Sequence, residues 1–265
     1  MNDRLWFTPR RDANIRRQVD GALCDVSDDD DLCLRAARLL ASTAAERGQT
    51  VPGVTIRVAK RLPIGGGLGG GSSNAATVLV ALNYYWQLAF SPQRLAELGL
   101  QLGADVPVFI HSRAAWAEGV GERLTPLALD QPWFTVLIPP VQVATATVFA
   151  DPQLTRDSRP ATMRAELTGF GNDCEAVVYR RYPAVAETAR LLAERAQAHS
   201  GEHVAVRLTG TGGCVFAAFD EREKAQAVLA GCEDDGACGF VSRGSNRSLL
   251  QDRLQQATMT ESFFK

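Results

Sequence analysis

Hydrophobic and polar residues alternate along several short stretches of the chain, and this period of two predicts β-strands. The clearest stretch is "GVTIRVAK", residues 53–60, which is typical of a half-buried strand that ends at Lys60. Two more strands are expected near the start, in "RLWFT" and "NIRRQV". The second half holds four more, in "WFTVLI", "VAVRL", "CVFAAF" and "GFVSR". The run "ADVPVFI" predicts a further apolar strand, which follows Asp105 and ends near His111.

Longer segments with a helical pattern lie between these strands. "DDDDLCLRAARLLASTAAE" begins with aspartates, which favour the positive end of a helix; the acidic run is a solvated capping loop or, alternatively, a metal site. "SNAATVLVALNYYWQL" is apolar on most faces, which indicates a buried helix. "SPQRLAELGLQLG" has Ser91 as its cap, Pro92 at its first position and Gly103 as its stop.

Two later helices are expected in "PAVAETARLLAERAQA" and "EREKAQAVLAG". The first has one apolar stripe, made of Val185, Ala189, Leu192 and Ala196. The second half then has the order strand, helix, strand, strand, helix, strand, which is the split βαβ arrangement of ferredoxin-like domains. We place a domain boundary near residue 125, so that residues 1–125 form one domain, residues 126–257 a ferredoxin-like domain and residues 258–265 a tail.

Composition narrows the class of protein. The 265 residues are 46% hydrophobic and 22% charged, which suits one large or two modest globular domains. A net charge of −2 gives no electrostatic footprint for nucleic acid. No apolar run is long enough to span a membrane, and the start lacks the apolar core of a signal peptide. The six cysteines are scattered without a CxxC pair, so we expect reduced thiols in a cytoplasmic protein.

The stretch "PIGGGLGGGSSNAAT" has six glycines between Gly65 and Gly71, broken only by Leu68. It lies between a predicted strand and a buried helix, so the unpaired N–H groups of the first helical turn face it. Those donors and the positive helix end suit a phosphate, and glycine lets the backbone approach the anion closely. Ser72 and Ser73 add hydroxyls that can reach a phosphate oxygen or Mg²⁺. The loop therefore predicts a polyphosphate site.

Other glycine loops fit less well. A P-loop requires a lysine after its glycines, and none follows here. The dinucleotide pattern GxGxxG occurs at Gly65, Gly67 and Gly70, but the acidic residue expected about 20 positions later is missing. The protein-kinase loop requires an HRD segment that the chain lacks. A mere linker would not lead directly into a buried helix.

The segment "KRLPIGGGLGGGSSNAATVLVALN" resembles the sequences of GHMP kinases, as do "LGADVPVF", "AEGVGERLTP", "GNDCE" and "RLTGTGGCVFAAF". The resemblance extends from about residue 30 to about residue 245. It implies an α+β fold with a GHMP-kinase N-terminal domain (ribosomal protein S5 domain 2-like) and a ferredoxin-like C-terminal domain. It also implies transfer of the γ-phosphoryl group of ATP, with Mg²⁺, to the hydroxyl of a small molecule. Within the family the wording is most similar to a branch whose substrate is a cytidine diphosphate polyol of the non-mevalonate isoprenoid route.

The resemblance assigns residues to roles. Asp105 matches the family's catalytic aspartate, which also touches the substrate; the alternative is a turn aspartate that binds its own backbone. The expected ATP-binding residues are Asp31, Lys60, Pro63, Ile64, Gly65, Gly66, Gly67, Leu68, Gly69, Gly70, Gly71, Ser72 and Ser73. The expected substrate-binding residues are Thr145, Phe149, Thr209, Gly210, Thr211 and Gly212, with the ring of Phe149 stacked on cytosine. No protein cluster for a metal is expected beyond Mg²⁺ held with ATP.

The chain departs from the family in two respects. Asp31 stands where relatives have an asparagine near the adenine, and a carboxylate cannot donate a hydrogen bond. Relatives also carry a segment before the position of Met1, with a catalytic lysine in a "PAKLN"-like motif and a Tyr-His pair. We therefore expect residues 1–265 to bind ATP but to phosphorylate poorly. The alternatives are a nucleotide-binding protein with little turnover, a GHMP kinase for another alcohol and, more distantly, a nicotinamide dehydrogenase.

Overall fold

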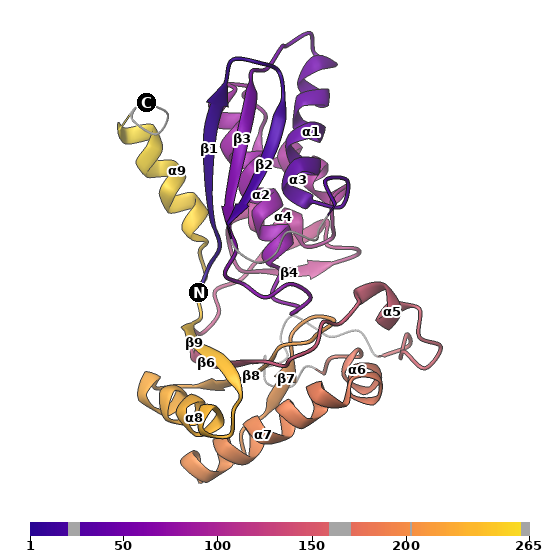
Figure 1. Cartoon of the computed structure of the whole chain (residues 1–265), viewed down its shortest axis with the longest axis vertical. Coiled ribbons are helices and arrows are strands. Elements are labelled where there is room, and N and C mark those ends of the chain that lie inside the picture. The colour runs from indigo at the N-terminus through magenta and orange to yellow at the C-terminus, as the bar shows by residue number, and fades with distance from the viewer. Residues whose placement is uncertain (21–26, 159–170, 202, 261–265) are drawn as a thin grey trace. The chain divides into compact units, whose positions relative to one another are not determined.

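The structure is a computed structural model that describes residues 1–20, 27–158, 171–201 and 203–260 (Figure 1). The chain divides into two compact units. The N-terminal unit comprises Asn2–Arg61, Gly69–Leu129 and the segment that begins at Ser245. The C-terminal unit comprises Met1, Leu62–Leu68 and Asp130–Gly244, so the glycine-rich run is shared between the two units.

The N-terminal unit contains a three-stranded sheet in the order β1-β3-β2. Its strands are β1 (Arg4–Arg10), β2 (Ile15–Asp20) and β3 (Gly53–Ala59). β1 runs antiparallel to β3, and β2 runs parallel to it. Val54, Ile56 and Val58 of β3 are buried in the hydrophobic core of this unit, as the alternation of the sequence predicts.

Four helices complete that core. They are α1 (Leu32–Ala45), α2 (Gly70–Tyr85), α3 (Pro92–Leu100) and α4 (Val106–His111). α1 begins at Asp31, whose side chain accepts a hydrogen bond from the N–H of Leu34. α3 begins at the predicted Ser91 cap but ends at Leu100, so Gly103 lies beyond the helix rather than at its stop.

The strand predicted in "ADVPVFI" is wrong, because this segment is the helix α4. Val106, Pro107 and Ile110 are buried on one side, and proline is well suited to the first turn of a helix. A short apolar run does not distinguish a strand from a buried helix by its pattern alone. His111 consequently ends a helix and not a strand.

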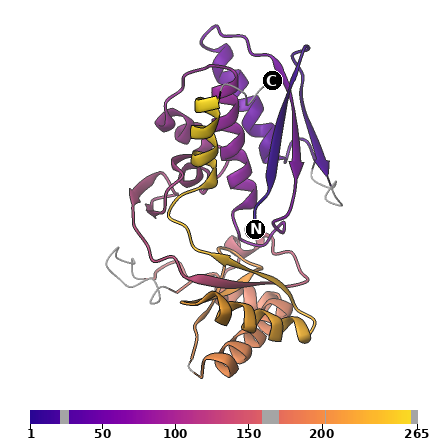
Figure 2. The same ribbon diagram turned by 90° about the vertical axis from the view of Figure 1, so that its left-hand side faces the viewer.

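The remaining elements of this unit are β4 (Ala115–Glu118), β5 (Arg123–Pro126) and α9 (Leu249–Thr260). β4 and β5 form an antiparallel hairpin. The side chain of Asn246 accepts a hydrogen bond from the N–H of Leu129 and donates one to its carbonyl. The helix α9 that follows lies against the helices of this unit (Figure 2). The described chain therefore departs from the expected division: Ser245 onward joins the N-terminal residues, and the predicted tail is helical to Thr260 before residues 261–265, which lie outside the described residues.

The C-terminal unit contains a four-stranded antiparallel sheet in the order β7-β8-β6-β9. Its strands are β6 (Trp133–Ile138), β7 (Val206–Leu208), β8 (Val215–Phe219) and β9 (Cys238–Arg243). Its helices are α5 (Thr145–Phe149), α6 (Glu175–Arg181), α7 (Pro183–Ser200) and α8 (Arg222–Asp234). α7 and α8 lie together on one face of the sheet (Figure 1), which is the predicted ferredoxin-like arrangement. The buried stripe of α7 is the predicted one.

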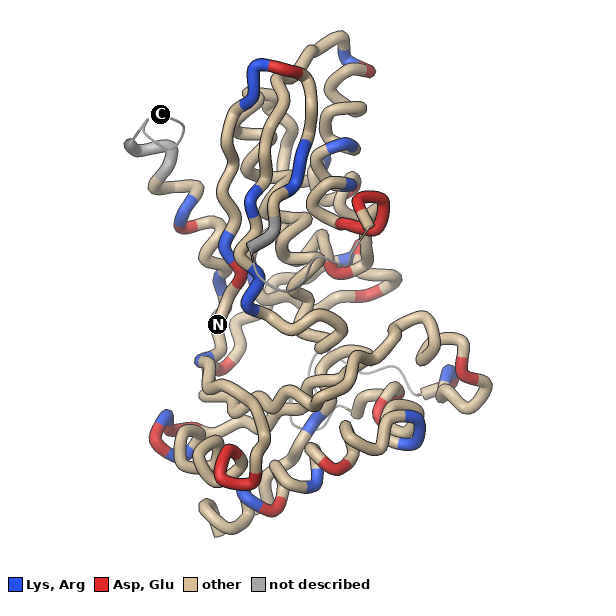
Figure 3. Tube along the Cα trace, in the orientation of Figure 1, with Lys and Arg blue, Asp and Glu red and all other residues tan. Residues whose placement is uncertain are grey.

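The acidic run before α1 forms a loop that leads into this helix (Figure 3), and its last residue, Asp31, caps the helix. Asp31 also pairs with Arg17 at 2.5 Å, while Asp29 pairs with Arg38 at 3.3 Å. Ser27 donates a hydrogen bond to Asp30 at 2.8 Å. Among the described residues no cluster of histidine, cysteine or carboxylate side chains is arranged to hold a metal ion.

Five cysteines are described, and all five are free thiols. Burial raises the pKa of Cys33 to about 12 and those of Cys214 and Cys232 to about 11, so these thiols are protonated and unreactive. Cys24 lies outside the described residues. Within the described parts of the chain, no helix combines the length and apolarity needed to cross a membrane.

Candidate functional site

The first turn of α2 is open to an anion. Its N-cap is Gly69, in the left-handed region at φ 66°, and no side chain caps the helix. A Cβ on Gly69 would lie 2.9 Å from the ring of Phe109, so glycine also permits α4 to approach this turn. The hydroxyls of Ser72 and Ser73 have no hydrogen-bond partner among the described residues. Amides and hydroxyls at this helix start can therefore all serve a phosphate.

Asp105 lies at the N-terminal end of α4 and is exposed. Its carboxylate does not bond its own backbone and has no ion-pair partner within the described chain, so the alternative of a self-bonded turn aspartate does not apply. The turn that carries it lies beside α2, because a Cβ on Gly103 would be 3.9 Å from the hydroxyl of Ser72. The N-terminal unit thus holds an unengaged carboxylate close to an uncapped helix start.

The β4–β5 hairpin supports the Asp105 turn. Gly121 has a φ of 102°, and a Cβ there would lie 2.2 Å from the carbonyl oxygen of Ala104. Within the hairpin turn, backbone N–H groups of Glu122 itself and of Val120 lower the pKa of the Glu122 carboxyl. The close approach of Gly121 to Ala104 gives the "AEGVGERLTP" motif a structural role.

Two predicted ATP contacts are engaged with protein groups. Lys60 donates to the carboxylate of Asp3 at 2.5 Å, and Asn74 donates to the same oxygen at 2.8 Å. Asp31 uses one carboxylate oxygen for the α1 cap and the other for Arg17. An ammonium has three donors and retains capacity for a further partner, whereas both oxygens of Asp31 already accept a hydrogen bond.

The first half of the glycine loop lies in the C-terminal unit, against the turn "TGTGG". The N–H of Gly213 donates to the carbonyl of Gly65 at 2.9 Å. The hydroxyl of Thr209 donates to the carbonyl of Gly66 at 2.6 Å. Gly67, at φ 71°, lies so close that a Cβ would be 2.0 Å from the carbonyl oxygen of Thr209. Hydrogen bonds therefore join two glycine-rich segments that lie far apart in the sequence.

"GNDCE" anchors that turn, a role the sequence reasoning did not assign. The amide of Asn172 donates to the carbonyls of Gly210 at 2.7 Å and Leu208 at 3.2 Å. Glu175 accepts the N–H of Leu208 at 2.9 Å. The motif itself was the only signal, because the partners lie more than thirty positions away.

The predicted substrate residues of α5 lie beside the same turn. The hydroxyls of Thr145 and Thr211 are 2.8 Å apart and hydrogen-bonded. The side chain of Phe149 is 55% exposed, which is unusual for a large apolar ring and leaves a face free for stacking. Arg156 holds the end of this helix by donating to the carbonyl of Phe149 at 2.5 Å.

Asp151, directly after α5, is a second residue that the sequence did not single out. It is only 2% exposed, and its carboxylate pairs with Arg181 and, at 2.9 Å, with Arg180. Hydrogen bonding by Arg181, then by the N–H of Gln153 and by Arg180, lowers the pKa of Asp151 to about 2. This cluster joins α5 to α6 within the C-terminal unit.

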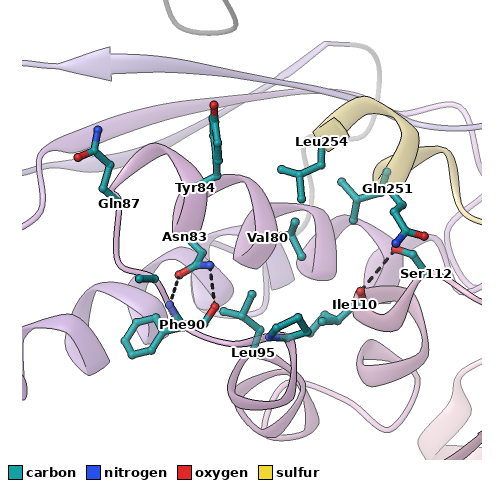
Figure 4. A pocket seen from close by; sticks show the side chains of 13 residues that line it. Val80, Asn83, Tyr84, Gln87, Phe90, Leu95, Ile110, Ser112, Gln251 and Leu254 are labelled. Carbon is teal, nitrogen blue, oxygen red and sulfur yellow. Dashed lines mark hydrogen bonds between the residues drawn. The ribbon is translucent and has the colours of Figure 1, made fainter. Parts of the chain in front are cut away.

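An apolar pocket of about 470 Å³ lies elsewhere in the N-terminal unit (Figure 4). It is bounded by α2, α3, α4 and α9, and none of the predicted site residues lines it. Its lining residues are Val80, Asn83, Tyr84, Gln87, Ala89, Phe90, Pro92, Leu95, Ile110, Ser112, Leu250, Gln251 and Leu254. The candidate site residues therefore lie away from this pocket, at the start of α2 in the N-terminal unit and at the "TGTGG" turn in the C-terminal unit.

Two family models match the chain. The model of the GHMP kinase N-terminal domain matches residues 31–113, and that of the GHMP kinase C-terminal domain matches residues 154–237. The first match includes the α2 turn and Asp105, and the second includes "GNDCE" and "TGTGG".

Two curated relatives are similar over most of their length. A 4-diphosphocytidyl-2-C-methyl-D-erythritol kinase of Pseudomonas savastanoi pv. phaseolicola is 49% identical over 254 residues, covering 96% of this chain and 83% of the relative. A protein of the same name from Nitrosococcus oceani is 48% identical over 255 residues, covering 96% of this chain and 86% of the relative.

Solved structures are also similar. A crystal structure of a 4-(cytidine 5'-diphospho)-2C-methyl-D-erythritol kinase matches with a TM-score of 0.70 and 29% identity, covering 93% of this chain and 86% of the other. A homoserine kinase from Cytophaga hutchinsonii matches with a TM-score of 0.65 and 15% identity, covering 92% and 86%. The second likeness concerns the fold alone.

Proposed function

The chain belongs to the GHMP kinase family and is a small-molecule kinase that uses ATP, and we propose that its acceptor is the hydroxyl of 4-diphosphocytidyl-2-C-methyl-D-erythritol. The two relatives that carry this substrate in their name support the choice. The observation that carries the chemistry is the unengaged carboxylate of Asp105 in a turn beside the uncapped start of α2.

The phosphates of ATP bind at the start of α2. The N–H groups of its first turn and the positive helix end stabilise the anion, and Gly69 keeps the approach open. Phosphoryl transfer requires mainly positioning and neutralisation of charge, and this turn supplies both. Ser72 and Ser73, in the first turns of α2, add hydroxyls that have no hydrogen-bond partner among the described residues.

Asp105 accepts the proton of the substrate hydroxyl. As the hydroxyl oxygen forms its bond to the γ-phosphorus, the bond from that phosphorus to the β-phosphate oxygen breaks and ADP leaves. The proton passes to the carboxylate of Asp105, which is exposed and unpartnered among the described groups.

Mg²⁺ fits the same turn, because the hydroxyls of Ser72 and Ser73 are unused oxygen donors and Mg²⁺ prefers few protein ligands in addition to phosphate oxygens. When bound, the ion neutralises charge on the transferred group.

We also place the reaction in the cytoplasm, which the free, buried thiols of Cys33, Cys174 and Cys214 support.

The cytidine end of the substrate binds the C-terminal unit. The exposed ring of Phe149 stacks on the cytosine, and Thr145 lies next to it with a hydroxyl bonded to Thr211. In the turn from Thr209 to Gly212, the N–H groups of Thr209 and Gly212 donate to the carbonyls of Cys214 and Thr209, so those of Gly210 and Thr211 are the backbone donors left for the polar part of the substrate.

A panel of acceptors tests the proposal. The protein, expressed from the longest open reading frame that contains these residues, is given MgATP with the cytidine diphosphate polyol, homoserine, mevalonate or phosphomevalonate. We expect phosphorylated product, seen by mass spectrometry, from the polyol at the highest kcat/KM. A higher kcat/KM with another alcohol would overturn the choice of substrate, and ATP binding without product from any alcohol would indicate a nucleotide-binding protein.

A further inference from the structure

We propose that Asp3 is a positioning residue that holds both ends of the glycine loop in place for ATP, an inference that rests on the proposed kinase function. The residue has no place among the site residues predicted from the sequence. It lies just before β1, far in sequence from the loop.

The strand register brings Asp3 to the loop. β1 and β3 are antiparallel, with Arg4 opposite Ala59, so Asp3 comes opposite Lys60, the last residue before the chain turns away from the sheet. The carboxylate accepts a hydrogen bond from Lys60 at 2.5 Å and from the N–H of Arg61 at 2.7 Å. These contacts fix the point at which the chain enters the loop.

A third contact fixes the point at which the chain returns. Asn74, in α2 one turn after the uncapped helix start, donates to the Asp3 carboxylate at 2.8 Å. The oxygen that accepts from Asn74 is the one that accepts from Lys60. One carboxylate therefore joins the end of β3 to the phosphate-binding turn of α2.

Burial makes these bonds costly to lose. The side chain of Asp3 is 2% exposed and that of Lys60 is 11% exposed. Asn74 is 6% exposed. Removal of one partner from such a group leaves buried charge or buried donors without full compensation.

We call the contacts of Asp3 with Lys60, Arg61 and Asn74 a clamp. The composition of the loop explains why the loop needs one. Between Arg61 and Asn74 the chain has six glycines, which lose more conformational freedom on ordering than any other residue. A loop whose ends are already held loses less freedom when ATP binds, so the ligand is bound more tightly. Asp3 thus acts on ATP through Lys60 and the start of α2, without touching the reacting atoms.

The test compares Asp3→Asn with Asp12→Asn. Asp12 is the control: like Asp3 it pairs with a basic side chain, Arg10 at 2.6 Å, and with an asparagine, Asn14 at 2.8 Å, but it lies at the β1–β2 turn of the same unit and its side chain is 41% exposed. We expect Asp3→Asn to raise KM for ATP by about tenfold or more, the scale of a lost charged hydrogen bond, and to leave KM for the alcohol unchanged. Asp12→Asn should leave both unchanged.

A second variant keeps the test decisive if Asp3→Asn does not fold. Asn74→Ala releases only the α2 end and retains the Asp3–Lys60 pair. It should raise KM for ATP by a smaller factor, and the effects of the two changes should not add, since they share one carboxylate. The proposal is overturned if both variants melt at a lower temperature but keep the parental KM for ATP, because the role of Asp3 would then be merely structural. If Asp3→Asn does not fold, the same result for Asn74→Ala alone overturns it.

Failure of the kinase assignment is distinguishable from failure of this inference. If the parent protein phosphorylates no alcohol, titration calorimetry with MgATP replaces KM as the readout. Weaker ATP binding by Asp3→Asn then still supports the clamp, and equal binding overturns it.

Discussion

Gly121 lies against the backbone of Ala104: a Cβ on Gly121 would be 2.2 Å from the carbonyl oxygen of Ala104, at a backbone φ of 102°. A side chain at position 121 would therefore force the turn that carries Asp105 to move. The hairpin therefore determines where the proposed catalytic carboxylate lies, although no hairpin side chain needs to touch the substrate.

Gly121→Ala should reduce turnover by about 100-fold, because a misplacement of about 1 Å in a catalytic group has effects of that order. Gly48→Ala is the control: Gly48 also has a positive φ, 73°, but no atom lies within 4 Å of its Cβ position. Initial rates at saturating ATP and alcohol measure the effect. Equal rates for the two variants would show that the hairpin does not position Asp105.

The contact between the glycine loop and the "TGTGG" turn leads to a second prediction. Gly67→Ala places a Cβ 2.0 Å from the carbonyl oxygen of Thr209. Overpacking of this kind costs about 1–3 kcal/mol, so ATP affinity should fall by about tenfold or more. Calorimetric titration with MgATP measures it. Gly236→Ala, in the same unit at φ 81° with open space around its Cβ, should bind ATP normally, and a similar loss there would refute the explanation.

Much of the fold could be predicted because local signals were strong. The stripe from Val185 to Ala196 on α7 and the Ser91 cap of α3 follow from side-chain spacing and capping chemistry alone. The α4 segment was predicted wrongly because "VPVFI" is short, apolar and β-branched, and only packing decides whether such a run is a helix or a strand. The short helices α5 and α6 were not predicted at all.

The site was predicted only in part, for a similar reason. The sequence of the glycine run predicts phosphate binding, but its pairing with Thr209 and Gly213 depends on residues more than a hundred positions away. Asp3 becomes visible only when the β1–β3 register is known. Asn172 lies in a recognisable motif, but the sequence does not show that its side chain donates a hydrogen bond to the carbonyl of Gly210.

Phe149→Ala tests recognition of the cytidine. The ring is 55% exposed, so its loss should disturb the fold little. Base–aromatic stacking is worth about 1–3 kcal/mol, and the dissociation constant of the cytidine diphosphate polyol should rise accordingly while that of ATP is unchanged. Trp6→Ala, which removes an exposed ring of the N-terminal unit, is the control. Unchanged polyol binding in Phe149→Ala would remove this residue from the substrate site.

Asp151 predicts a pH dependence of stability. Its pKa is lowered from 3.8 to about 2, chiefly by Arg181, so the folded state favours the charged form. The stabilisation is complete above pH 3.8 and is lost as the pH falls toward about 2. Asp151→Asn should therefore melt at a lower temperature at neutral pH, and the difference from the parent should shrink as the pH falls through this window. Asp234→Asn, at an exposed aspartate of the same unit, should show no such convergence; a gap for Asp151→Asn that is constant with pH would contradict the account.

The central claim is that Asp105 receives the proton of the substrate hydroxyl. Its most direct test is single-turnover transfer from MgATP to the cytidine diphosphate polyol by Asp105→Asn, which keeps the shape of the side chain but cannot accept that proton. We expect the rate to fall by about 10²–10⁴-fold, the usual contribution of a general base, with ATP affinity unchanged. Asp29→Asn, an exposed aspartate of the same unit, should transfer at the parental rate. Transfer by Asp105→Asn at the parental rate would contradict the claim.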